Sequence, residues 1–87
     1  MNIRQSYDKI ADAIYLQFRD SKIHKTKEFD SGILVDYDKQ GFVVGVEVLD
    51  AVRRKFKFSI MVPKKSSHSA EISAGKSRVN LPIPYYL

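Results

Sequence analysis

The strongest constraint on the fold is a pair of apolar, β-branched runs separated by a short polar segment. The first run covers residues 33–35 and the second covers residues 42–49, with Gly41 directly before the second. β-Branched residues favour extended backbone, and glycine adopts the positive φ that a hairpin turn or bulge needs. The pattern predicts a β-hairpin. Because Val48 and Leu49 point to opposite sides, its second strand is expected to be covered on both faces.

Alternating patterns predict further strands before this hairpin. Residues 12–19 alternate apolar and polar side chains, and a turn-like segment joins them to residues 3–7, so an N-terminal hairpin is predicted. A helix is the alternative, because short apolar runs fit both periods. Residues 24–29 carry Lys25 and Lys27 at alternate positions, which is typical of an edge strand, where charge discourages pairing with other molecules.

The second half of the chain has a less regular pattern. Asp50 is a candidate N-cap for a short helical turn, and residues 56–62 alternate as a strand does. Residues 63–81 are rich in serine and basic side chains, which predicts a loop or connector. Residues 82–87 contain two prolines, which favour an extended apolar arm over a helix.

These patterns predict a mainly β fold, with α+β as the alternative. We expect a single antiparallel β-meander of five to six strands over residues 1–62, with at most one short helix near residues 50–55. The connector (63–81) and the arm (82–87) follow it. A chain of 87 residues buries only about 60–65% of its unfolded surface, so the core is thin and self-association would stabilise it.

Composition excludes several classes of protein. Hydrophobic residues make up 44% of the chain and charged residues 29%, as in a soluble globular domain. No apolar run approaches the roughly 20 residues of a membrane span, and the first residues lack a signal-peptide stretch. We therefore expect a cytoplasmic protein with no membrane association. With no cysteine, a zinc finger, an iron–sulfur protein and a disulfide-stapled module are excluded.

Charge is divided unevenly along the chain. Residues 1–50 contain seven Lys/Arg and nine Asp/Glu (7 − 9 = −2), and residues 51–87 contain eight Lys/Arg and one Glu (8 − 1 = +7), which gives the total of +5. An acidic half joined to a basic half indicates an anionic partner or a self-complementary contact. A solvated basic tail is the alternative.

The acidic segment around Gly41 has the ligand spacing of a calcium-binding EF-hand loop. Loop positions 1, 3 and 5 are Asp36, Asp38 and a glutamine, and position 12 is Glu47. An EF-hand loop lies between helices, however, and this one lies between predicted strands, so an acidic turn is favoured. Asp36 and Glu47 also fit a magnesium-dependent nuclease, except that Leu49 replaces its lysine. We expect no metal and no cofactor, and the three carboxylates are only weak candidates.

No residue carries a recognisable catalytic signature. Residues 74–77 match the end of a phosphate-binding P-loop but lack its first glycine, its strand and its helix. His24 and His68 have neither a second histidine nor a carboxylate at ligand spacing. The serines around His68 lack the glycine-flanked turn of an acyl-transfer nucleophile. The sequence therefore predicts a protein that is not an enzyme.

A basic segment after residue 50 is the stronger binding candidate. Its cationic residues are Arg53, Arg54, Lys55, Lys57, Lys64 and Lys65. Cations that neutralise phosphates, interleaved with rings that stack on bases, suit single-stranded nucleic acid. The favoured alternative is that Phe56 and Phe58 face the core while the lysines face water, as strict alternation requires.

Three blocks of the chain, residues 7–16, 32–38 and 41–51, resemble a known family. The positions that match its pattern are Tyr7, Asp8, Ala11, Asp12, Asp36, Asp38, Gly41, Gly45 and Glu47. Over roughly residues 3–55 the chain is similar to the small prokaryotic proteins grouped as domain of unknown function 2283. The resemblance implies a compact, strand-rich domain with no established activity, and an antitoxin-like or partner-binding role, because some members occur beside small toxin genes. Residues 56–87 lie outside it.

The sequence thus favours a non-enzymatic protein-interaction module that self-associates or binds a protein partner. The contacts are expected at a sheet edge and at the arm that carries Tyr85 and Tyr86. A nucleic-acid-binding protein that uses the basic residues is the second hypothesis. A metal-dependent enzyme that uses the acidic hairpin is the third.

Overall fold

The predicted hairpin around Gly41 is confirmed in the computed structural model of the protein, which describes residues 3–61 and 68–83. Strand β4 (Ile33–Tyr37) pairs antiparallel with β5 (Val43–Leu49), and Gly41 has a φ of +89° in the turn between them. β5 is covered on both faces only over its first half. Val48 is fully buried, whereas Leu49 is 38% exposed.

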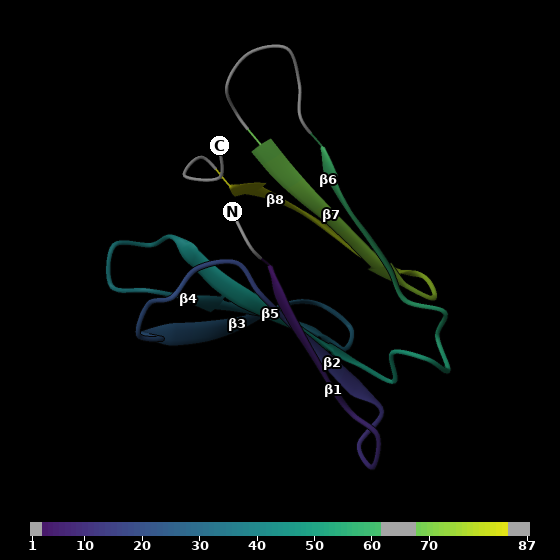
Figure 1. Ribbon diagram of the computed structural model, residues 1–87. Coiled ribbons are helices and arrows are strands. Elements are labelled where there is room, and N and C mark those ends of the chain that lie inside the picture. Colours follow the sequence, from purple (N-terminus) through teal and green to yellow (C-terminus); the bar gives the residue numbers. More distant parts are fainter. Residues whose placement is uncertain (1–2, 62–67, 84–87) are drawn as a thin grey trace.

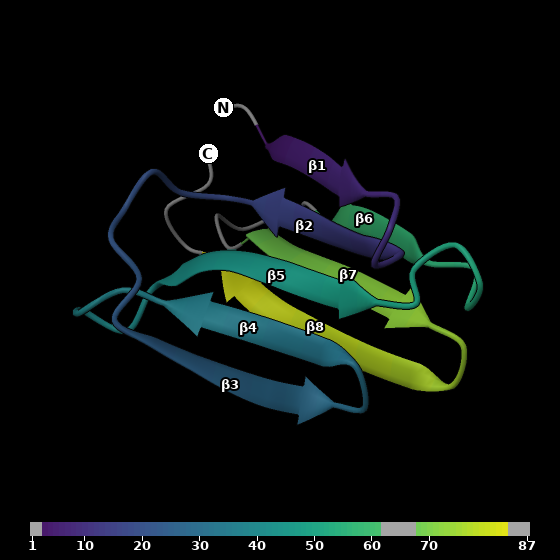
Figure 2. The same cartoon turned by 90° about the horizontal axis from the view of Figure 1, so that it is seen from below.

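Five strands form the larger sheet, which is the lower layer in Figure 1. Their order is β1-β2-β5-β4-β3, as Figure 2 shows. β1 (Arg4–Asp8) and β2 (Ala13–Gln17) form the predicted N-terminal hairpin, so the strand interpretation is confirmed over the helical one. β3 (Lys25–Asp30) is the edge strand that its lysines indicate.

The connection after β5 consists of hydrogen-bonded turns over residues 50–55, and the described residues contain no helix. The Arg54 amide donates to the Asp50 carbonyl at 2.8 Å. Asp50 itself has a φ of +54° and does not act as the predicted cap. Instead the Asp12 carboxylate accepts hydrogen bonds from the amides of Val52 (3.0 Å) and Arg53 (3.2 Å). The cap comes from a residue distant in sequence, which local capping rules do not detect.

The remaining strands form a second, three-stranded sheet. Its members are β6 (Lys57–Met61), β7 (His68–Ala74) and β8 (Ser77–Ile83), in that order. β6 confirms the predicted strand over residues 57–61, and residue 62 lies outside the described part. The connector predicted for residues 63–81 is wrong from residue 68 onward, because β7 and β8 occupy most of it. Their period of two is hidden in the sequence by serines and alanines, and residues 63–67 lie outside the described part.

The predicted arm is also corrected where it begins. Pro82 and Ile83 belong to β8, and Ile83 is fully buried. A proline is compatible with this strand because β8 is an edge strand and the nitrogen of residue 82 points away from β7. Residues 84–87, which include Tyr85 and Tyr86, lie outside the described residues, as do Lys64 and Lys65.

The two sheets lie face to face (Figure 1), and their inner faces enclose one core. The expected single meander is therefore two antiparallel sheets with eight strands, although the mainly β class is confirmed. The apolar inner face of the large sheet needs a cover, and the alternating side chains of β7 and β8 provide it. The largest fully buried side chains are Leu16, Ile33, Ile72, Leu81, Ile83, Val35, Val44, Val46 and Val48.

Candidate functional site

Asp36, a weak metal candidate, links three strands on the outer face of the large sheet. Its carboxylate accepts a hydrogen bond from the Tyr15 hydroxyl at 2.7 Å and another from the Thr26 hydroxyl. The Tyr15 ring lies directly over Gly45, where a Cβ would collide with it. Burial, together with the hydrogen bond to Asp36, raises the pKa of Tyr15. Asp36 therefore holds β2, β3 and β4 together.

Asp38 is committed to the turn between β4 and β5. It is only 3% exposed, and its carboxylate accepts hydrogen bonds from the amides of Gln40 and Phe42, each at 3.0 Å. The Ser21 hydroxyl also donates to it at 3.2 Å, and Arg19 lies 3.4 Å away. Burial alone would raise the pKa of Asp38, but these donors and the nearby cation outweigh burial and lower it.

The three acidic candidates do not converge on one point. A register shift between Asp36 and Tyr37 interrupts the alternation of side-chain directions along β4. Glu47 of β5 lies opposite Leu34 of β4. Over residues 3–61 and 68–83, no group of three His, Cys, Asp or Glu side chains is arranged to hold a metal ion. The geometry does not favour the metal-dependent hypothesis.

Arg54 is the central residue of the basic segment, and it acts within the fold. Its Nε donates to the Leu49 carbonyl (3.2 Å), Nη1 to the Ser77 hydroxyl (3.1 Å) and Nη2 to the Ser31 carbonyl (3.0 Å). One side chain thus joins the connection after β5 to the turn between β3 and β4 and to β8. Three of the five N–H groups of this guanidinium are therefore engaged within the fold.

The other residues of this segment alternate as expected. Arg53 forms an ion pair of 2.8 Å with Asp50. Lys55 and Lys57 are exposed, and the rings of Phe56 and Phe58 pack against the core. Cations and rings therefore point to different sides of the chain, which does not favour base stacking at this segment.

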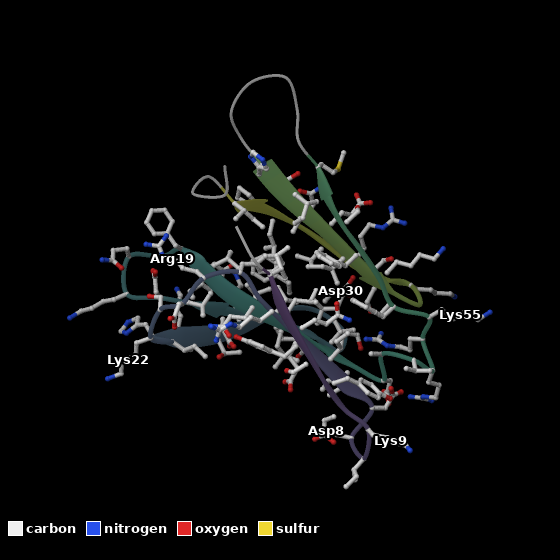
Figure 3. The ribbon with its side chains drawn as sticks, in the orientation of Figure 1. Asp8, Lys9, Arg19, Lys22, Asp30 and Lys55 are labelled. Atoms are coloured by element: carbon white, nitrogen blue, oxygen red, sulfur yellow. The ribbon has the colours of Figure 1, made fainter. Side chains whose placement is uncertain are left out.

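The side of the sandwich formed by β3 and β8 is closed to further strands. The Asp30 carboxylate, which lies between the sheets in Figure 3, accepts a hydrogen bond from the Arg78 amide of β8 at 2.9 Å. Hydrogen bonds from the Arg78 and Ser31 amides lower the pKa of Asp30. Pro82 offers no N–H at the same edge. β3 carries two lysines and a register shift between Glu28 and Asp30, and both discourage edge pairing.

The opposite side, formed by β1 and β6, is open, and we call it the open side (Figure 2). For β1, the Phe18 amide donates to the Val44 carbonyl of β5 at 2.8 Å. Because backbone groups alternate along a strand, residues 13, 15 and 17 then face β1, opposite Asp8, Ser6 and Arg4. The backbone groups of Gln5 and Tyr7 consequently point outward.

The same reasoning applies to β6. Since the Arg78 amide points outward from β8, residues 77, 79 and 81 bond to β7, and residues 69, 71 and 73 of β7 face β6. The backbone groups of Phe58 and Ile60 therefore point to the open side. Their side chains are only partly buried at the rim of the core, together with Ile3.

Sequence reasoning expected a sheet edge but did not locate the open side. The proline at residue 82 is a signal that β8 is an edge, but only once residues 77–83 are known to form a strand. Whether β1 and β6 lie on one side depends on how the two sheets stack, and no local pattern encodes that.

A family model with the description "Protein of unknown function (DUF2283)" matches residues 4–51. The matched span ends at the first residues of the connection and covers all five strands of the large sheet, so β6, β7 and β8 lie beyond it. No curated protein and no solved structure matches the chain. Among the described residues, no helix is long and apolar enough to cross a membrane.

Proposed function

We propose that this chain, which belongs to the DUF2283 family of proteins of unknown function, is a non-enzymatic protein-interaction module of the prokaryotic cytoplasm. It binds a protein partner at its open side by accepting an additional strand. An antitoxin-like role, which the resemblance implies, would be one instance of this activity.

The observation that carries the proposal is the contrast between the two sides of the sandwich. The β3/β8 side is blocked by Pro82, by lysines and by the hydrogen bond from the Arg78 amide to Asp30. The β1/β6 side has none of these devices among its described residues, and it presents unpaired backbone beside the partly buried Phe58 and Ile60. Strand addition supplies backbone hydrogen bonds to an edge of this kind, and side-chain pockets add specificity.

A proline in β1 tests the proposal. The Gln5 amide points outward and its side chain is exposed, so Gln5→Pro removes an edge donor without breaking the pairing with β2. Gln5→Ala is the matched control, because it removes the side chain and keeps the amide. Tagged wild type and both variants are purified from the native host with nuclease and a high-salt wash. We expect a protein partner to be retained by wild type and Gln5→Ala and lost from Gln5→Pro. Equal retention by all three would overturn the proposal.

Nucleic-acid binding is the second candidate function, favoured by one row of side chains on the outer face of the small sheet. Lys57 and Arg78 lie on either side of Ser73, one on each neighbouring strand. Two cations around a hydroxyl suit a phosphate. Binding of a labelled single-stranded oligonucleotide should then fall steeply with salt, and less steeply in a Lys57→Gln/Arg78→Gln variant. Salt-independent binding would exclude it.

A further inference from the structure

The two sheets are unequal, and on the open side the larger sheet extends beyond the smaller one. β8 lies near β3 and β4, and the ring of Phe58 in β6 contacts Phe18 directly after β2, with ring centroids 6.3 Å apart. β8 therefore lies at the β3/β4 end of the larger sheet, and β6 lies opposite the end of β2. As a result, β1 extends beyond β6. All five side chains of β1 are exposed, as are all six of β3, so both edge strands of the larger sheet are little covered.

β1 and β6 run in opposite directions. The Asp12 carbonyl, at the turn where β1 ends, accepts a hydrogen bond from the Ala51 amide at 2.9 Å. The Ala51 carbonyl in turn accepts one from the Phe56 amide at 2.9 Å, directly before β6 begins. β1 therefore runs toward the end of the sandwich from which β6 departs, which Figure 1 also shows.

We propose that the partner at the open side is a second copy of this chain, bound about a two-fold axis parallel to the strands. This inference rests on the proposed function and specifies its partner. The rotation places the three-stranded sheet of one copy beside the five-stranded sheet of the other, so β1 of each copy pairs antiparallel with β6 of the other. The result is two continuous antiparallel sheets of eight strands each. β1 of each copy, which extends beyond β6 of its own chain, then lies beside β6 of the other copy.

Both strands have five residues, so a single antiparallel register aligns them over their full length. In this register the outward backbone groups of Gln5 and Tyr7 meet those of Ile60 and Phe58 of the second copy. The resulting residue pairs are Arg4 with Met61, Gln5 with Ile60, Ser6 with Ser59, Tyr7 with Phe58, and Asp8 with Lys57.

The side chains in these pairs are complementary on both faces. On the inner face, the ring of Tyr7, which is 45% exposed in the single chain, meets the partly buried Phe58 of the second copy. On the outer face, Asp8 lies opposite Lys57, which places opposite charges together. A shift of two residues in either direction separates the Tyr7–Phe58 pair and leaves strand ends unpaired.

Pairing β6 with β6 of a second copy is the obvious alternative, and it fails sterically. An antiparallel pair of that kind keeps both large sheets on the same side of the joined small sheets. Because β1 of each copy extends beyond β6, the two overhanging strands would occupy the same space.

Cysteine cross-linking tests the proposed register directly, since the natural chain contains no cysteine. Ser6 and Ser59 are exposed and form the central non-hydrogen-bonded pair, where Cα atoms lie about 4.5 Å apart and a disulfide fits. Within one chain the two side chains point to opposite outer faces and cannot join. We expect Ser6→Cys/Ser59→Cys to give a covalent dimer under mild oxidation. The matched control Ser6→Cys/Met61→Cys, shifted by two residues, should remain uncrosslinked.

Light scattering separates the failure of this inference from that of the proposed function. We expect a dimer mass for wild type and Gln5→Ala and a monomer mass for Gln5→Pro. A monomeric wild type, or equal cross-linking of both cysteine pairs, would overturn the symmetric dimer. If such a monomer still bound a different protein that Gln5→Pro lost, the proposed function would stand without the dimer. Binding unaffected by Gln5→Pro would overturn both.

Discussion

Two side chains, Asp12 and Arg54, determine how the chain passes from one sheet to the other. Asp12 caps the turn after β5, and Arg54 donates to the turn between β3 and β4 and to β8. Their partners are mostly backbone groups on other elements. Such groups are costly to leave without a partner when the side chain is removed.

Removing the Arg54 side chain should therefore destabilise the protein more than removing its neighbour. We expect Arg54→Ala to lower the free energy of unfolding by about 2 kcal/mol, because two carbonyls and a hydroxyl lose a charged donor in a partly buried site. Arg53→Ala should cost less than about 1 kcal/mol, since Arg53 forms only an exposed ion pair with Asp50. Urea denaturation measures both. Equal losses would show that Arg54 does not connect the elements.

Acid should destabilise the protein through its bonded carboxylates. Hydrogen bonds hold the pKa values of Asp12, Asp30 and Asp38 below the ordinary value of 3.8. Because the folded-state pKa is the lower one, these groups stabilise the fold fully above about pH 4, and the effect is lost as pH falls below that value. Thermal denaturation between pH 2 and 5 should show a shallower decline for Asp30→Asn than for wild type. Asp20→Asn, on the loop after β2, is the control, and parallel curves for all three would contradict the assignment.

Among the secondary-structure elements, the alternation of apolar and polar residues predicted strands where β-branched or aromatic residues occupied the apolar positions. This alternation predicted the β1–β2 and β4–β5 hairpins and β6, whereas the alternate lysines indicated the edge position of β3. The same alternation missed β7 and β8 because Ala74 and Ser77 are poor strand formers that become buried only through contact with the other sheet. The basic segment also made Arg54 a candidate for ligand binding, because a sequence shows a charge but not the groups that the charge contacts.

The second sheet should be required for the first to fold. A chain that ends at residue 56 retains the family-matched region but exposes the inner face, including Leu16, Val35 and Val46. Five strands without a cover lack a closed core. We expect this truncated chain to show no cooperative thermal transition by circular dichroism, whereas the full chain should show one. A cooperative transition in the monomeric truncated chain would contradict this expectation.

In the whole molecule, the uneven distribution of charge along the sequence brings an acidic and a basic side chain together at the proposed dimer interface. Asp8 belongs to the acidic half and Lys57 to the basic half, and the proposed dimer places them opposite each other. Lys57→Glu should therefore weaken dimerisation by about tenfold, because each of two symmetric contacts becomes a repulsion of up to about 1 kcal/mol. Lys76→Glu, on the turn between β7 and β8, changes net charge equally and should have little effect. Sedimentation equilibrium compares the two, and equal weakening would indicate a general charge effect.

Amide hydrogen exchange at the open side tests directly whether a second copy pairs there. In a single sandwich the amides of Gln5, Tyr7, Phe58 and Ile60 point to solvent and should exchange rapidly. If the open side binds a strand of a second copy, these amides become protected as protein concentration rises, while the Asn80 amide at the closed side does not change. We predict that concentration-dependent protection. Exchange of all four at the rates of exposed amides, at every concentration, would contradict the claim that a second copy pairs at the open side.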